Sequence, residues 1–306
     1  MKKLLAAIGL LVVLAGCQST DAPESQINIA VPHGNTSYAL TWMMTNGADL
    51  EGADLNFEIM PNAEALAARV LEGVDLAIVP VNMAASLYNK DAGYLVAGVA
   101  TWGNLFVLSA NDEINGWDDL DGNLVHAFGR GLVPGAAFSY LLERNEAAAD
   151  VEYLSTPGEV AQAMIGGIAD VALLADEKVT QVLEQTDARI ILDLNAEWGG
   201  EGYPQGVIIV SEALAQQDPE LVRELLAEMA LSMDWANENP AELGILASRL
   251  DEAADAKLIE ASIERLHIRF QSSAEAQTQI IGFLEALYGM NPELVGGQVP
   301  GDALFY

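Results

Sequence analysis

Two stretches of the chain share the same order of polar and apolar positions. The first, residues 61–82, reads PNAEALAARVLEGVDLAIVPVN, in which apolar residues at helical spacing end at Gly73 and a short apolar run follows. The second, residues 156–176, reads TPGEVAQAMIGGIADVALLAD and sets Glu159 95 positions after Glu64. A helix that leads directly into a short apolar strand is the unit of a parallel α/β sheet. The sequence therefore predicts that this unit occurs twice.

Each copy is preceded, at a matching distance, by a further strand, loop and helix. These begin with INIAVPHGNTSYALTWMM at Ile27 and NLVHAFGRGLVPGAAFSYLLERN at Asn123. The pattern predicts two similar βαβαβ halves, and thus an α/β, two-lobed fold in which helices flank a mixed sheet in each lobe. Because loops at the ends of the strands would line the gap between the lobes, we expect a ligand cleft there.

The lobe boundaries follow from polar, turn-rich segments. Residues 111–122, NDEINGWDDLDG, have the composition of a crossing between lobes, and residues 205–210, QGVIIV, read as a strand that returns to the first lobe. We therefore expect residues 27–109 together with 206–306 in lobe 1, and residues 110–205 in lobe 2. At 306 residues the chain is long enough for two hydrophobic cores.

The N-terminus has the features of an export signal. Residues 1–17 contain Lys2, Lys3 and an apolar run, and Leu14 to Cys17 resemble the lipobox of bacterial lipoproteins. In that motif the cysteine becomes the lipidated first residue of the mature chain, so we expect a protein anchored to the cell membrane on its periplasmic or extracytoplasmic face. Residues 18–26 are polar and read as a tether. Cys17 is the only cysteine, which excludes a disulfide within the chain.

Charge and motif content exclude several functions. The formal net charge of −32 argues against nucleic-acid binding, which requires clusters of Lys and Arg. There is no G-x-S-x-G motif or P-loop, and none of the three histidines has a second His or Cys at metal-ligand spacing. We therefore expect a binding protein without metal, cofactor or catalysis of its own.

The lipobox, tether, paired halves and helical C-terminal segment resemble the solute-binding proteins of ABC importers. The segments VDLAIVPVNMAASLYNK and WDDLDGNLVHAFGRGLVPGAAFSYLLE are similar to the nitrate, sulfonate, taurine and thiamine-pyrimidine group, although Asn123 stands where a Lys is common. The resemblance implies a type II periplasmic-binding-protein fold, a monomer whose lobes close on a small molecule, and partners in an ABC permease and its ATPase. It also implies a sulfonate or taurine-like ligand, or a pyrimidine-like heterocycle.

Candidate ligand-binding residues lie in loops at strand ends. Arg130, with Gly131, either holds an anionic group of the ligand or is an exposed loop arginine. Asp176 either binds a cationic group or only starts a helix. The remaining candidates have a structural alternative as caps, packing residues or hinge residues: His33, Asn35, Thr36, Asn82, Trp102, Trp198 and Tyr203.

Two other classes of function stay open at this point. An enzyme on the same fold, similar to menaquinone-pathway lyases or thiamine-pyrimidine synthases, is one, but the export signal argues against it because those enzymes are cytoplasmic. A sensor or adhesion lipoprotein that uses the fold only for contacts is the other. Two tryptophans against one arginine in the expected cleft favour a planar heterocyclic ligand over an inorganic anion.

Overall fold

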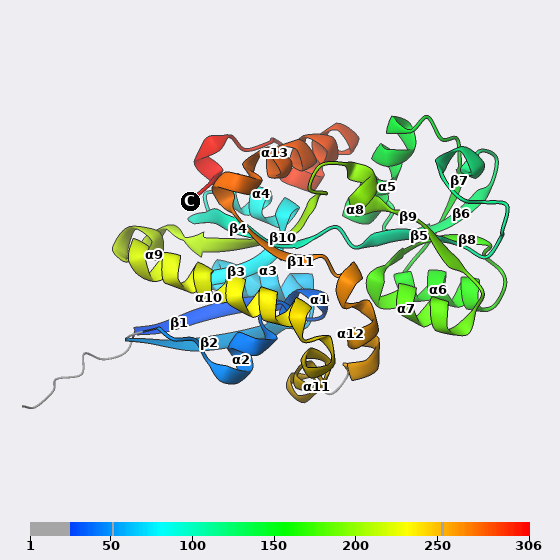
Figure 1. Cartoon of the computed structure of the whole chain (residues 1–306). Helices are drawn as coiled ribbons and strands as arrows, with labels where there is room; N and C mark the ends of the chain where they lie inside the picture. Colours follow the sequence, from blue (N-terminus) through cyan, green and yellow to red (C-terminus); the bar gives the residue numbers. More distant parts are fainter. Residues whose placement is uncertain (1–24, 51, 252–253) are drawn as a thin grey trace, which may run out of the picture.

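The computed structural model describes residues 25–50, 52–251 and 254–306, which form two α/β lobes side by side (Figure 1). The predicted signal peptide, Cys17 and residues 18–24 of the predicted tether lie outside the described residues. Among the described helices, none combines the length and apolar character that crossing a membrane requires.

Lobe 1 is built on a six-stranded mixed sheet in the order β11-β4-β10-β3-β1-β2. Strand β1 is parallel to β2 and β3, whereas β10 runs antiparallel to both β3 and β4. The strands are β1 (Ser25–Pro32), β2 (Ala53–Met60), β3 (Leu76–Pro80), β4 (Tyr94–Trp102), β10 (Pro204–Ser211) and β11 (Ile268–Ser272).

Lobe 2 has a five-stranded sheet in the order β7-β6-β8-β5-β9. Its order β5-β8-β6-β7 matches β10-β3-β1-β2 of lobe 1 strand for strand, with the same parallel and antiparallel pairings. The predicted duplication is therefore confirmed. The strands are β5 (Leu105–Ser109), β6 (Leu124–Phe128), β7 (Asp150–Leu154), β8 (Val171–Ala175) and β9 (Arg189–Asp193).

Helices cover the sheets of both lobes (Figure 1). Those of lobe 1 are α1 (Asn35–Tyr38), α2 (Thr41–Asn46), α3 (Ala63–Glu72), α4 (Val81–Tyr88), α9 (Glu212–Gln217), α10 (Pro219–Glu238), α11 (Pro240–Leu250), α12 (Ala256–Ser262) and α13 (Ser273–Met290). Those of lobe 2 are α5 (Val133–Arg144), α6 (Pro157–Ile165), α7 (Asp176–Gln185) and α8 (Leu194–Trp198). Short 3-10 helices occupy Trp117–Leu120, Ile263–Arg265, Pro292–Val295 and Asp302–Leu304.

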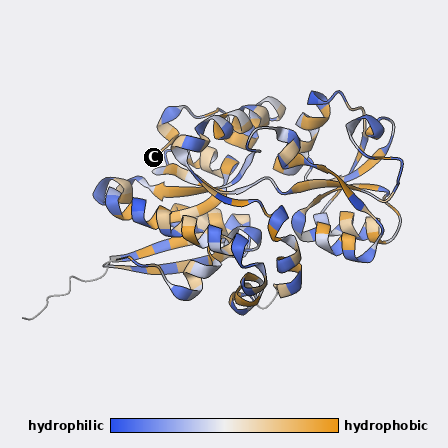
Figure 2. Cartoon of the chain, in the orientation of Figure 1, coloured by the Kyte–Doolittle hydropathy of each residue, from blue (hydrophilic) through white to orange (hydrophobic). Residues whose placement is uncertain are grey.

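The central strands are apolar on both faces, as a sheet covered by helices on both sides requires. In β3, Leu76 and Ile78 face one core cluster, whereas Ala77 and Val79 face the other. Figure 2 shows the same arrangement, with hydrophobic strands inside each lobe and two-toned helices outside. This burial explains why Leu76 to Val79 form an uninterrupted apolar run that ends at Pro80.

The lobe boundary differs from the predicted one. Strand β5 (Leu105–Ser109) was expected in lobe 1, but it pairs with β8 and β9 of lobe 2. The chain therefore crosses between the lobes at Gly103 and Asn104, and residues 111–122 lie within lobe 2. The prediction was wrong because nothing in the local sequence of an antiparallel strand says which sheet it joins.

The two crossings between the lobes lie next to each other and are joined by hydrogen bonds. The Gly103 backbone N–H donates to the Tyr203 carbonyl over 2.9 Å. The side-chain oxygen of Asn195 accepts from the backbone N–H of both Gly103 and Tyr203, each over 3.1 Å. Trp102 and Pro204 are paired residues of β4 and β10. The junction is thus a short two-stranded ribbon clamped by one asparagine.

The first prediction concerns the turn between α3 and β3. The buried Tyr94 hydroxyl accepts from the Val74 N–H over 3.0 Å and lies 3.0 Å from the carbonyls of Val70 and Val74. Tyr94→Phe leaves the Val74 N–H without a partner, so we expect it to lower the free energy of unfolding by about 2 kcal/mol. Chemical denaturation measures this, with Tyr88→Phe as the control because that hydroxyl makes no hydrogen bond among the described residues. Equal stability of both variants would contradict this role of Tyr94.

Candidate functional site

A cavity of about 530 Å³ lies between the two lobes. Lobe 1 contributes residues that follow β1 and β3, the first turn of α4, and Phe283 of α13. Lobe 2 contributes the end of β6, the start of α5 and the end of β8. Asn104, Leu105 and Tyr203, at the two crossings, complete the wall. Parallel strands of both lobes therefore end at this cavity, the position at which open α/β sheets bind ligands.

Five of the predicted site residues line this cavity: His33, Asn35, Thr36, Asn82 and Tyr203. The His33 ring contacts the Asp251 carboxylate. The Asn82 amide donates to the Leu294 carbonyl over 3.2 Å. The loop after β1, the start of α4 and the junction thus meet at one place, as the duplicated halves predicted.

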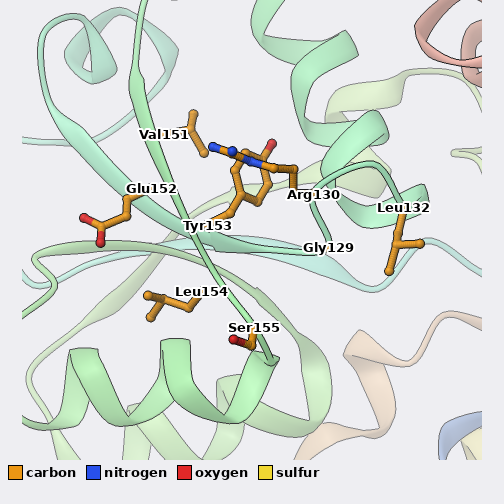
Figure 3. A pocket seen from close by; sticks show the side chains of 8 residues that line it. All are labelled: Gly129, Arg130, Leu132, Val151, Glu152, Tyr153, Leu154 and Ser155. Atoms are coloured by element: carbon orange, nitrogen blue, oxygen red, sulfur yellow. The ribbon is translucent and has the colours of Figure 1, made fainter.

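Arg130 and Gly131 do not line the cavity. Figure 3 shows Arg130 lying over the ring of Tyr153, and its guanidinium carbon is 5.0 Å from the ring centroid. Arg130 belongs instead to a surface pocket that also contains Glu152 and Ser155. The loop around Arg130 adopts positive φ at Gly129 (76°) and Gly131 (72°), a backbone conformation that glycine accommodates. Arg130 is exposed, as the structural alternative of an exposed loop arginine describes.

Trp102 and Trp198 also lie outside the cavity. Trp102 is 1% exposed, its indole N–H donates to the Arg269 carbonyl over 3.1 Å, and the Arg269 guanidinium lies 4.6 Å from its ring centroid. Trp198 stacks on Tyr140 at 4.8 Å. Its other neighbours are Tyr203 and Phe283, which do form the cavity wall, so Trp198 lies behind that wall.

Asp176 has a structural contact between the lobes. It is 1% exposed at the start of α7, and its Oδ1 lies 2.6 Å from Nε of Arg265. The same guanidinium donates to the Thr180 hydroxyl over 2.5 Å. Arg265 follows α12 of lobe 1, so this ion pair holds α7 of lobe 2 against lobe 1. Asp176 is not among the residues that line the cavity, although its neighbour Ala175 is.

Three of the cavity residues that sequence reasoning missed come from parts of the chain with no predicted site residue beside the cavity or from the crossings themselves. Gln205 is the second residue of β10, Asn104 lies at the first crossing, and Phe283 comes from α13. The Phe283 ring stacks on Tyr203 at 4.8 Å with an interplanar angle of 23°. For Phe283 no local signal exists, since it has the same helical spacing as the core residues Ile280 and Leu284. Asn104 was missed because the first crossing was expected at residues 109 and 110, whereas the second crossing was expected beside Gln205 and that residue was still not recognised.

Tyr203 is held as a protonated phenol. Burial, and then the charge of Asp193, raise the pKa of the Tyr203 hydroxyl, against a smaller lowering effect of the Leu105 backbone N–H. The ring passes directly over Gly103, where a Cβ atom would come within 2.1 Å of it. Gly103 is therefore required for Tyr203 to reach the cavity.

Two further basic residues of lobe 1 reach acidic residues of lobe 2 behind the cavity. Arg269 pairs with the Glu201 carboxylate and donates to the Glu201 carbonyl over 3.0 Å. His267 donates through Nδ1 to the Gly103 carbonyl, and its Nε2 lies 3.5 Å from Oδ2 of Asp193. Within the described residues, no group of three or more His, Cys, Asp or Glu side chains lies close enough to hold a metal ion.

The two sheets and the cavity between the lobes define the class, the two-lobed periplasmic-binding-protein fold. A model of the prokaryotic lipoprotein lipid attachment site matches residues 1–18. A second model, described as NMT1/THI5 like, matches residues 50–243, more than half of the chain, so the protein belongs to the NMT1/THI5-like family.

Solved structures of ABC transporter proteins share this fold. An ABC transporter protein from Parabacteroides distasonis is 24% identical, with a TM-score of 0.80 over 92% of this chain and 98% of the other. The alkanesulfonate-binding protein of Xanthomonas axonopodis pv. citri, bound to MOPS, is 15% identical, with a TM-score of 0.66 over 92% and 98% of the two chains. The nitrate-binding protein of Synechocystis PCC 6803 is 11% identical, with a TM-score of 0.64 over 87% and 82%. The search of curated proteins gave no match.

The second prediction concerns His267. Burial lowers its pKa, but the hydrogen bonds to Asp193 and the Gly103 carbonyl and the nearby charges of Asp193 and Asp176 outweigh burial, so the pKa is raised overall. A raised pKa in the folded state means that the charged ring stabilises the fold below the unfolded pKa of about 6.5. This contribution is lost as the pH rises through the folded-state pKa.

We therefore expect the melting-temperature difference between the wild type and His267→Asn to shrink from about pH 6 to about pH 8. Asparagine suits the test because it does not titrate and tolerates the positive φ of 46° at this position. Asp193→Asn is the matched control, since asparagine can still cap α8 but carries no charge. A difference that stays constant or grows with pH would contradict the assignment.

Proposed function

We propose that this protein is the solute-binding component of an ABC importer, which captures a small organic molecule in the cavity between its lobes and delivers it to a membrane permease. The observation that carries the proposal is the cavity itself, which is lined from both lobes and from the two crossings that join them. Its volume of about 530 Å³ falls in the range typical of small-molecule sites.

The arrangement of the lobes supports capture by closure. Only the ribbon at Gly103 and Tyr203 carries the backbone between the lobes, next to the contacts made by Arg265, His267 and Arg269. A ligand that contacts both lobes binds the closed arrangement more tightly than the open one. The equilibrium between the two arrangements therefore shifts toward the closed one by the difference between the two binding free energies. The permease then distinguishes the loaded protein by its closed form.

The lipid anchor suits the same function. Cys17, at the end of the signal segment, places the folded part at the membrane that holds the permease, and the tether gives it reach. In this proposal the anchored protein acts as a monomer and delivers its ligand to an ABC permease and its ATPase.

The third prediction tests ligand capture. The unlipidated chain from Gln18 onward, which keeps every described residue, should melt at a higher temperature in the presence of its solute, because a ligand that binds only the folded state stabilises it by mass action. Differential scanning fluorimetry against a metabolite panel measures this. Chemical turnover of a stabilising compound by the purified protein would favour an enzyme, and the absence of any stabilising compound would contradict solute binding.

The fourth prediction tests the anchor. Growth with an alkyne-tagged fatty acid should label the protein, and Cys17→Ser should abolish the label, because Cys17 is the only cysteine in the chain. Ser19→Ala, two positions further on, is the control and should be labelled like the wild type. Labelling that survives Cys17→Ser would overturn lipidation at this residue.

A further inference from the structure

We propose that the ligand is an uncharged organic solute, with an apolar body and polar groups at one end that Tyr203 and Gln205 recognise. The inference rests on the proposed function and names the chemical class that the same cavity accepts. It is drawn from three properties of the wall: its charge, its apolar surface, and the position of buried polar atoms that have no partner.

The described cavity wall carries no Lys, Arg, Asp or Glu side chain. Its ionisable members are His33, whose ring is paired with Asp251, and Tyr203, which burial keeps protonated. The candidate cation from the sequence, Arg130, lies on Tyr153 in an adjoining pocket, which shares Leu132 with the cavity but does not place Arg130 in its wall (Figure 3). An ionised ligand would lose its hydration on entry without gaining a fixed opposite charge, which is strongly unfavourable.

The chain as a whole also opposes an anionic ligand. Its formal net charge of −32 lowers the concentration of anions near the protein surface at low ionic strength. Basic residues that lie near the lobe junction, such as Arg265 and Arg269, are paired with carboxylates. The first turns of α4 and α5 do offer partial positive charge at the cavity, which suits a carbonyl or ring-nitrogen acceptor of a neutral molecule.

Most of the remaining wall is apolar. The stacked rings of Tyr203 and Phe283 form one side, and Phe128, Leu105 and Leu132 add further apolar surface. The body of the ligand is therefore apolar.

Three of the buried side-chain polar atoms that lack a hydrogen-bond partner among the described residues lie near this cavity: Thr101 Oγ1, Tyr203 OH and Gln205 Oε1. The Leu105 backbone N–H acts on the Tyr203 oxygen as a donor, so what the phenol lacks is an acceptor for its own proton. Tyr203 directly precedes β10, Gln205 is the second residue of that strand, and Thr101 lies on the paired strand β4, opposite Gly206. Buried polar groups in folded proteins are almost always hydrogen-bonded, so such a cluster at the edge of a cavity calls for an external partner.

Tyr203 and Gln205 line the cavity, whereas Thr101 does not. The phenol is a donor, and the amide offers both an acceptor and donors, so together they match a ligand edge that carries an acceptor beside a donor. Such an edge occurs in amides and in the lactam or amino groups of heterocycles. These two side chains are the determinants of ligand specificity in the proposed reading.

The test uses the unlipidated chain from Gln18 onward and compounds of three charge classes. The uncharged probes are nicotinamide and thymine, the anionic probes are nicotinate, orotate and an alkanesulfonate, and the cationic probes are choline and thiamine, each within a wider metabolite panel. We expect stabilisation by uncharged members, with a dissociation constant that is the same in low and high salt. Stabilisation only by anions or cations overturns this inference but leaves solute binding intact. No stabilisation by any member contradicts both.

The second arm tests the two side chains against the best uncharged compound. Tyr203→Phe and Gln205→Leu should each weaken binding about tenfold or more, because each leaves a polar group of the ligand unpaired in a closed cavity. Thr101→Val removes the neighbouring buried hydroxyl outside the cavity, and Arg130→Ala removes the arginine of the other pocket. Both controls should bind like the wild type. Unchanged affinity in both Tyr203→Phe and Gln205→Leu, with melting temperatures showing folded variants, overturns the assignment.

Discussion

The structure depends on the exchange of one antiparallel strand between the two lobes. Strand β5 leaves lobe 1 to complete the sheet of lobe 2, and β10 returns to lie between β3 and β4. Because both crossings pass the same point, the lobes are joined by a ribbon in which Asn195 ties Gly103 to Tyr203. The cavity lies against this ribbon, so the same residues that connect the lobes also form part of its wall.

Charge is distributed unevenly around this junction. The chain is strongly acidic, yet three basic residues in alternating positions, Arg265, His267 and Arg269, each contact a carboxylate of lobe 2. The cavity on the other side carries no Lys, Arg, Asp or Glu side chain among the described residues. Ionic contacts thus hold the lobes together, and under the proposed function hydrogen bonding and apolar contact select the ligand.

The sequence predicted features that depend on local pattern. The duplicated helix and strand and the lipid attachment site are encoded by residues close together in the chain, and both are confirmed. The sheet to which β5 belongs and the direction of the Arg130 side chain depend on contacts with distant residues. Gln205 was likewise hidden, because its importance arises only where β10 meets β4 and the cavity.

The strand exchange also sets an order for folding during secretion. All strands of lobe 2 lie between Leu105 and Asp193 in one continuous segment, whereas lobe 1 needs β10 and β11 from far down the chain. A polypeptide that emerges from a translocon amino-terminus first can therefore finish its second lobe while the first still has open strand edges at β3 and β4. Lobe 1, which contains the first described strand of the chain, is therefore the last to be completed.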